Sequence, residues 1–155
     1  MRMSPPSILS ATEGEVYRAG PFTITARVLG PQTDRTFELY ELKLGQATID
    51  YHVHMTMDET LTVLAGEIEF IVEGEKYLRS AGSVAFIPRG VHHGFSNLGT
   101  APARVLVLFT PAGNQHEYFR ELERLFAAPV LDQAALQALQ KRYDQELIDL
   151  PSAAR

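Results

Sequence analysis

Two histidines separated by a single residue constrain this chain more than any other feature of its sequence. His52 and His54 lie in residues 49–54, a run that is typical of a β-strand. Because side chains alternate along a strand, both imidazoles project from the same face. Glu59 follows closely, and His93 begins a later strand candidate. Three imidazoles and one carboxylate form a four-ligand set that suits a first-row divalent metal ion and leaves room for water or substrate.

The chain around these residues is divided into short strand candidates by regularly spaced turn signals. Gly74 supplies the positive φ that a hairpin turn over residues 72–75 needs. The phase of residues 36–44 stays open, because apolar residues occupy both of its alternating sets. Many short strands at even spacing predict an all-β sandwich or barrel. The candidates are residues 15–18, 22–28, 36–44, 49–54, 59–64, 67–72, 76–79, 83–88, 93–97 and 104–110.

In the last third of the chain the apolar residues recur at helical spacing. Asn114 followed by Glu117 has the pattern of a capping box, and Pro129 ends this first helix. Asp132 begins a second helix, which is expected to stop before Pro151. Its apolar stripe consists of Leu136, Leu139, Tyr143 and Leu147.

Length and pattern together predict one globular domain with an added helical segment. The chain has 155 residues, which is enough to bury a substantial core. We expect a loose lead-in over residues 1–12, a β-barrel over residues 13–112, and C-terminal helices over residues 113–155. The apolar stripes of these helices are expected to pack on the barrel or on a partner subunit.

Composition and charge exclude several classes of partner. The net charge is -5, with 19 acidic and 14 basic residues and no basic run, which argues against binding to nucleic acid. No apolar run approaches the ~18 residues of a membrane span, and the N-terminus lacks the apolar core of a signal peptide. Cysteine is absent, so disulfide and thiol chemistry are excluded. These features predict a cytoplasmic protein.

Residues 45–66 and 82–97 resemble the paired sequence motifs of the cupin family. In the first motif every spacing from His52 to Gly66 fits, whereas six residues separate Gly45 from His52, one more than usual. In the second motif every position fits, namely Gly82, Pro88, Arg89, Gly90, His93 and Asn97. The resemblance implies a double-stranded β-helix, or jelly-roll, barrel. It also implies that the metal ligands are His52, His54, Glu59 and His93.

The motif spacing separates two adjacent histidines. Counting from Gly90 assigns His93 to the interior, so alternation turns His92 toward the rim or solvent. Phe95 shares the face of His93 and is expected to line the substrate pocket. Asn97 is expected to bond backbone groups at a turn.

The positions of three further residues, which are not expected to bind metal, can also be predicted. His116 is expected on the surface of the first helix, with a position over the barrel mouth as the alternative. Leu61 and Phe86 are expected either in the plain barrel core or in the lining of the pocket.

The resemblance implies an enzyme similar to quercetinase-like single-domain cupins that carry helices after the barrel. A divalent iron, manganese or nickel ion is favoured, with zinc or copper as alternatives. The expected reaction is dioxygenation of a small aromatic or enolic substrate, with Glu59 doubling as a proton acceptor. The alternatives are a cupin isomerase or decarboxylase and a non-catalytic protein that binds a small ligand. A homodimer is expected.

Overall fold

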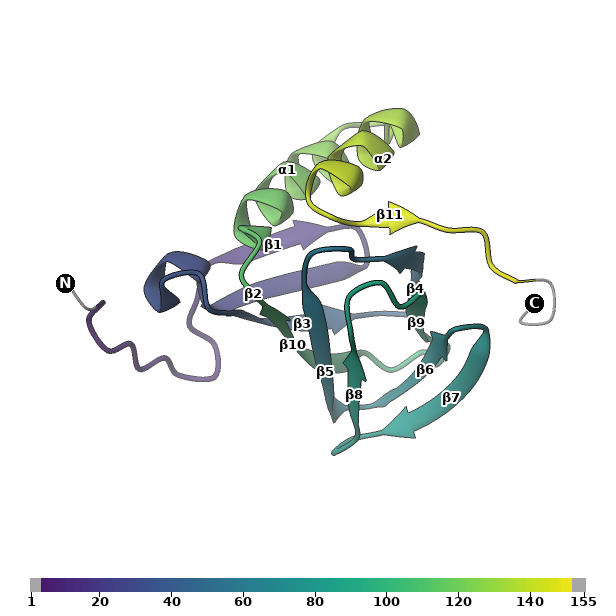
Figure 1. Ribbon diagram of the computed structural model, residues 1–155, viewed down its shortest axis with the longest axis horizontal. Helices are drawn as coiled ribbons and strands as arrows, with labels where there is room; N and C mark the ends of the chain where they lie inside the picture. The colour runs from purple at the N-terminus through teal and green to yellow at the C-terminus, as the bar shows by residue number, and fades with distance from the viewer. Residues whose placement is uncertain (1–3, 152–155) are drawn as a thin grey trace.

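Strands with one apolar face drive this chain into two antiparallel β-sheets that pack on each other (Figure 1). The computed structural model describes residues 4–151, so residues 1–3 of the expected lead-in and 152–155 of the C-terminal segment lie outside it. The larger sheet has the order β1 (Val16–Ala19), β2 (Phe22–Val28), β3 (Glu38–Leu44), β10 (Ala103–Thr110), β5 (Asp58–Ala65) and β8 (Val84–Ile87). The smaller sheet has the order β11 (Glu146–Leu147), β4 (Ala47–Val53), β9 (His93–Asn97), β6 (Glu67–Val72) and β7 (Glu75–Ser80).

The predicted jelly roll with two C-terminal helices is confirmed, although its sheets stay separate and do not close into one hydrogen-bonded barrel. Between β6 and β7 the turn takes positive φ at both Glu73 and Gly74, as a tight hairpin requires. A short 3₁₀ helix, η1 (Gly30–Thr33), connects β2 to β3.

The core lies between the facing sheets and settles the phase of β3. Its even-numbered residues, among them Tyr40 and Leu44, point inward, while Leu39 is only half-buried. From the smaller sheet, Ile68 and Phe95 meet them in the same apolar cluster. Burying each such side chain contributes roughly 1.5–3 kcal/mol. The core therefore fixes which face of every strand can carry a functional group.

The expectation that Leu61 and Phe86 lie in the barrel core or line the pocket is half correct. Leu61 is fully buried, but Phe86 is 61% exposed. The register explains the difference, because Phe86 lies opposite Thr60, one residue out of phase with Leu61. Phe86 therefore lies on the outer face of the larger sheet, away from the core.

The second C-terminal helix is shorter than its apolar pattern predicts. The two helices are α1 (Gln115–Ala127) and α2 (Gln133–Arg142), and Asp132 caps α2 by accepting from the Ala135 N–H at 3.0 Å, as expected. The helix does not continue to Leu147, because Asp144 takes a left-handed φ of 64°. Residues 146–147 instead form β11 and pair with β4. No helix within residues 4–151 is long and apolar enough to span a membrane.

The expected capping box at the start of α1 is wrong. Asn114 has a φ of 53°, and its side chain makes no capping hydrogen bond. The cap comes from Glu38 on β3, whose buried carboxylate accepts from the backbone N–H groups of Gly113 and Gln115, the latter at 2.8 Å. The Tyr40 hydroxyl donates to the same carboxylate at 2.5 Å. A strand carboxylate therefore fixes the helix to the larger sheet, and its charge suits the positive end of the helix dipole.

We predict that Glu38→Ala lowers the free energy of unfolding by roughly 2 kcal/mol or more, because hydrogen bonds to a charged group contribute about 1.5–3 kcal/mol. Chemical denaturation measures this change. Glu41→Ala is the matched control, since Glu41 lies on the outward side of the same strand and pairs with Arg104 near the surface. Such exposed pairs contribute about 0–1 kcal/mol. Equal effects of the two substitutions would contradict the capping role.

Candidate metal centre

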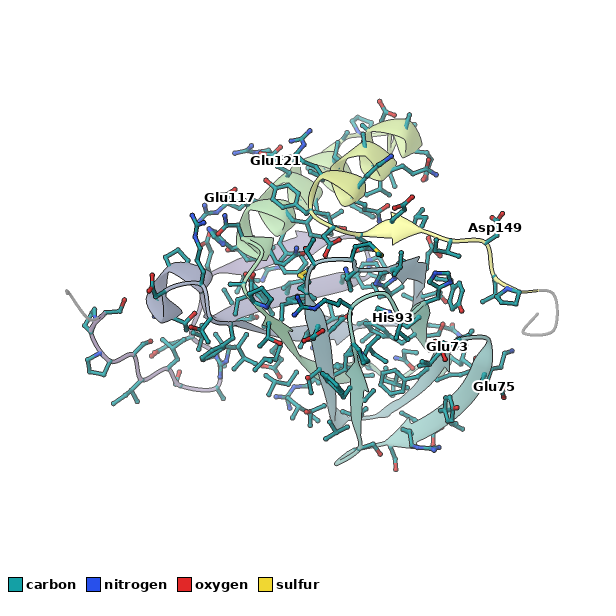
Figure 2. The ribbon with its side chains drawn as sticks, viewed as in Figure 1. Glu73, Glu75, His93, Glu117, Glu121 and Asp149 are labelled. Atoms are coloured by element: carbon teal, nitrogen blue, oxygen red, sulfur yellow. The ribbon has the colours of Figure 1, made fainter. Side chains whose placement is uncertain are left out.

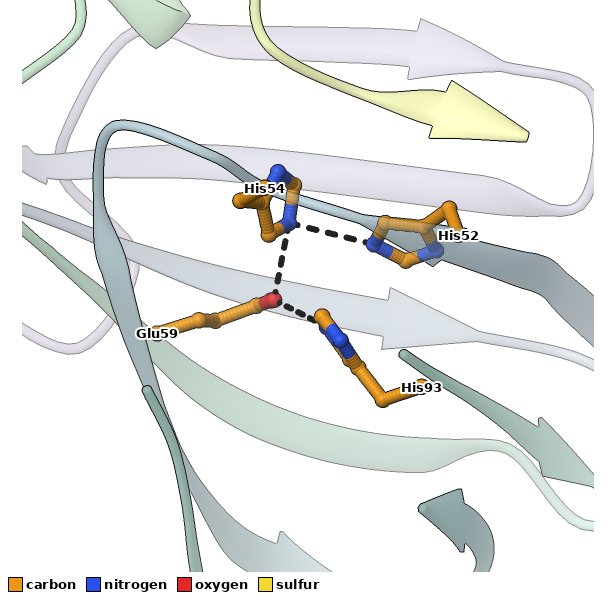
Figure 3. Close-up of side chains that lie close together, drawn as sticks. All are labelled: His52, His54, Glu59 and His93. Atoms are coloured by element: carbon orange, nitrogen blue, oxygen red, sulfur yellow. Dashed lines mark hydrogen bonds and ion pairs between the residues drawn. The ribbon is translucent and has the colours of Figure 1, made fainter. Parts of the chain in front are cut away.

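Four buried side chains from three strands and one adjoining turn meet between the sheets (Figure 3). His52 lies on β4, His54 directly follows it, Glu59 lies on β5 and His93 opens β9. One nitrogen or oxygen atom from each lies within 4.8 Å of the others. Figure 2 shows His93 among the interior side chains, whereas Glu75 and Asp149 project from the surface.

The distances within this cluster identify the Nε2 atoms as the groups that converge. Glu59 Oε2 lies 2.7 Å from Nε2 of His93 and 3.0 Å from Nε2 of His54. The Nε2 atoms of His52 and His54 are 3.1 Å apart. The sequence-predicted set of four residues is therefore brought together with its ligand-type atoms facing one point.

Backbone carbonyl groups orient all three imidazole rings. Nδ1 of His52 lies 2.6 Å from the carbonyl oxygen of Asp50, and Nδ1 of His93 lies 3.0 Å from that of Val91. Nδ1 of His54 lies 2.6 Å from the carbonyl oxygen of Asp144. A carbonyl oxygen only accepts, so each Nδ1 carries a proton, and the Nε2 atom that faces the centre is left to bind a cation or a second proton.

A β-bulge places His52 in this ring of groups. The β4–β9 register runs from Ile49 opposite Phe95 to His52 opposite His93, so β4 contains one extra residue. Gly94 lies beside the bulge, where a Cβ atom would come within 2.9 Å of the Ile49 carbonyl oxygen. The close approach of the two strands therefore depends on a glycine at this position.

The Pro88–Gly90 corner holds the turn between the ligands of β4 and β5. The Gly90 N–H donates to the carbonyl oxygen of His54 at 2.7 Å. Arg89 donates from its backbone, at 2.9 Å, and from its guanidinium to the carboxylate of Asp58, which precedes Glu59. Gly90 has a φ of 83°, a region that favours glycine. The motif residues Arg89 and Gly90 therefore hold the turn between His54 and Asp58 in place by hydrogen bonds.

The electrostatics of the cluster favour a bound cation. Burial, with His93 and His54 nearby, lowers the pKa of His52 to about 3, so its ring is neutral. Burial opposes ionisation of Glu59, but hydrogen bonds from His54 and His93 outweigh it and hold the pKa of this carboxyl well below its usual range. Burial also opposes a charge on His54, yet the Glu59 carboxylate raises the pKa of this imidazole. Without another cation, a proton on His54 balances the carboxylate.

The donor set fits a divalent metal ion on chemical grounds. Every Nδ1 proton is engaged by a carbonyl group, so three neutral rings and the Glu59 carboxylate would present four acceptor atoms and no donor to one another. The 3.1 Å contact between two imidazole Nε2 atoms is unfavourable unless a positive charge lies beside it. A metal ion supplies that charge, and imidazole with carboxylate suits first-row divalent ions.

The cluster opens onto a cavity of about 290 Å³ that reaches the C-terminal helices. Phe95 and Phe109 line it near the histidines, and the Phe109 ring centroid lies 5.8 Å from that of His54. Tyr118 and Phe119 of α1 and Leu136 of α2 form its opposite wall. The helices therefore contribute directly to the space in front of the cluster.

The remaining sequence expectations have mixed outcomes. His92 is exposed, as expected, and Asn97 donates to the backbone carbonyls of Leu44 and Ala101 at 3.2 and 2.8 Å. The surface position expected for His116 is wrong, because it is 8% exposed on the packed face of α1. Sequence reasoning also missed Asp144, whose carbonyl oxygen contacts His54 across 90 positions of the chain. No local pattern signals such a distant contact.

Comparison with known proteins identifies the family that this fold and site define. A family profile described as a cupin domain matches residues 38–109, the segment that contains all four clustered residues. The chain belongs to the cupin superfamily.

Individual relatives carry different names. Quercetin 2,3-dioxygenase of Bacillus subtilis is 34% identical over 110 residues, which cover 70% of this chain and 32% of that protein. KdgF from Halomonas sp. has 21% sequence identity to this chain, and its solved structure matches with a TM-score of 0.65. The match covers 72% of this chain and 99% of the KdgF chain. A predicted oxalate decarboxylase from Thermotoga maritima is 18% identical with a TM-score of 0.63, covering 68% and 99%.

The chain matches only part of each curated relative. The chain spans 32%, 50% and 55% of the lengths of three curated relatives. The two solved structures, both below 25% identity, show the fold alone.

We predict that removing metal with a strong chelator lowers the melting temperature of the wild-type protein and leaves that of His54→Ala unchanged. Binding to the folded state alone adds about 2.7 kcal/mol at a hundredfold excess over Kd. For a chain of this size that corresponds to roughly 5–10 °C. Differential scanning calorimetry measures the shift. An unchanged wild-type curve, with metal loss shown by elemental analysis, contradicts the prediction.

The two adjacent histidines provide a matched pair for a second prediction. His93→Ala removes an Nε2 atom from the cluster and should lose most of the bound metal. His92→Ala changes an exposed ring outside it and should keep near wild-type occupancy. Elemental analysis after identical purification compares them. Metal loss from His92→Ala instead would refute the inward assignment of His93.

Proposed function

We propose that this chain is a metal-dependent cupin dioxygenase that acts on a small aromatic or enolic substrate. One observation carries the proposal: His52, His54 and Glu59 of the four-residue cluster line a cavity whose other walls are largely aromatic and aliphatic side chains. The volume of about 290 Å³ is near the lower end of the range of roughly 300–1,000 Å³ for small-molecule sites. Similarity to a quercetin 2,3-dioxygenase supports an aromatic substrate.

His52, His54, Glu59 and His93 would hold one divalent transition metal ion. Iron, manganese or nickel suits this N/O set best, with zinc and copper as the alternatives. When bound, such an ion supplies Lewis-acid and redox chemistry toward an oxygen-bearing substrate and dioxygen.

The residues around the ion bind the substrate and take up its proton. Phe95 and Phe109 would contact a flat ring, and the apolar wall excludes water from it. Glu59 would accept the proton of an enol or phenol hydroxyl.

We further propose that the protein forms a homodimer through the outer face of the larger sheet. Leu64, Val84 and Phe86 are exposed there on the neighbouring strands β5 and β8. Leu106 and Leu108 of β10 extend the same face, because they lie opposite Thr62 and Thr60. Apolar side chains gathered on one exposed sheet face in this way are typical of an interaction surface.

We predict oxygen consumption by protein loaded separately with Fe(II), Mn(II) or Ni(II) in the presence of a flavonol, a diketone or a catechol. An oxygen electrode measures uptake, and chromatography measures substrate loss in the same samples. Phe95→Leu should raise KM, because it removes a ring from the cavity wall. Tyr77→Leu is the matched control, because it removes an exposed ring on β7 that does not line the cavity, and it should leave KM unchanged.

Other outcomes of this assay identify the alternative functions. Substrate loss without oxygen uptake would replace the dioxygenase with a cupin isomerase or decarboxylase. Tight binding of a compound that stays unchanged with every metal would indicate a non-catalytic binding protein.

A further inference from the structure

The end of helix α2 places an aspartate where glycine is the usual residue. The Asp144 N–H donates to the carbonyl oxygen of Lys141 at 3.3 Å, and the Gln145 N–H donates to that of Gln140 at 2.9 Å. This pair of hydrogen bonds is the Schellman motif, whose left-handed position is most often glycine. Asp144 occupies that position with a φ of 64°. A residue with a Cβ atom is disfavoured there, so its side chain must contribute something in return.

The carboxylate of Asp144 binds the turn that follows His54. One oxygen, Oδ1, accepts from the backbone N–H of Met55 at 2.7 Å. The other, Oδ2, accepts from the N–H of Thr56 at 2.9 Å and from its hydroxyl at 2.7 Å. Three donors therefore lock the first residues after a candidate ligand onto the end of α2.

The backbone of the same aspartate contacts the candidate ligand itself. Its carbonyl oxygen lies 2.6 Å from Nδ1 of His54 and fixes the ring with Nε2 toward the cluster. The carbonyl keeps this place because the carboxylate anchors the residue from the other side. Beyond it, Gln145 lines the cavity, and β11 pairs with the strand that carries His52.

We propose that Asp144 is a positioning residue of the metal centre. Through it, the end of α2 would hold His54 in the orientation that metal binding requires. The proposal rests on the proposed function only in requiring that the four-residue cluster binds a metal. Loss of the carboxylate frees the turn at Met55 and Thr56, and the carbonyl then no longer holds His54 in place. Groups that orient a metal-bound histidine typically change metal affinity by 10–100-fold.

The test compares Co²⁺ binding by full-length wild-type protein, Asp144→Gly, Asp144→Asn and Asp34→Gly. Asp34 is the matched control, since it too is an aspartate with positive φ after a helix, at 51°, and its exposed side chain lies outside the cluster. Competition with a chromophoric chelator gives the Kd, and the Co²⁺ absorption spectrum reports the ligand geometry.

We expect Asp144→Gly to weaken Co²⁺ binding at least about tenfold and to change the spectrum. Its metal-free melting temperature should fall only modestly, because glycine suits the left-handed position and offsets part of the lost hydrogen bonds. Asp144→Asn, which keeps one carbonyl oxygen, should restore part of the affinity, and Asp34→Gly should match wild type. Should Asp144→Gly fail to fold, the affinity and spectrum of Asp144→Asn decide the question.

The outcomes separate this proposal from the function on which it rests. Wild-type affinity and spectrum in Asp144→Gly would overturn the positioning role and leave the metal centre standing. The same holds if its metal-free form melts far below wild type while Co²⁺ binds unchanged, since the role would then be structural alone. Failure of the wild-type protein to bind Co²⁺ or any other divalent ion would overturn both proposals.

Discussion

Four polar groups meet in the apolar space between two sheets, and the interaction among them governs the rest of this structure. Burying a carboxylate and three imidazoles costs free energy unless each atom finds a partner. Backbone carbonyl groups accept hydrogen bonds from the three Nδ1 atoms. The Glu59 carboxylate lies within hydrogen-bond distance of the Nε2 atoms of His54 and His93. The centre still presents more acceptors than donors, which is the condition that a cation relieves.

The support for this centre lies where regular β-structure is interrupted. The bulge in β4 brings His52 opposite His93, and Gly94 permits the close strand approach that the bulge requires. The corner at Gly90 ties the carbonyl of His54 to the next loop. Regular strands would supply the apolar walls but would leave these backbone carbonyls in ladder hydrogen bonds, unavailable to orient a ring.

The C-terminal segment is joined to the sheets by two carboxylates as well as by apolar packing. Glu38 caps the first turn of α1, and Asp144 binds the turn after His54. Between these anchors the helices contribute Tyr118 and Leu136 to the cavity wall. The space in front of the cluster therefore depends on the helices, and its shape is a property of the sheets and the helices together.

The sequence alone determined the four clustered residues, the all-β jelly roll and the start of α2 at Asp132. The start of α2 follows from a short-range rule, a cap three residues from its partner, whereas the jelly roll and the set of four residues follow from the resemblance to the paired cupin motifs. The tertiary structure decided the features that join distant parts of the chain. Glu38, 77 positions before Gln115, replaced Asn114 as the cap of α1, and Phe86 faced solvent because it pairs opposite Thr60 on the outer face of the sheet. A local pattern fixes where a side chain points relative to its own strand or helix. It carries no information on which other element will lie beside it, because that depends on the path of the whole chain.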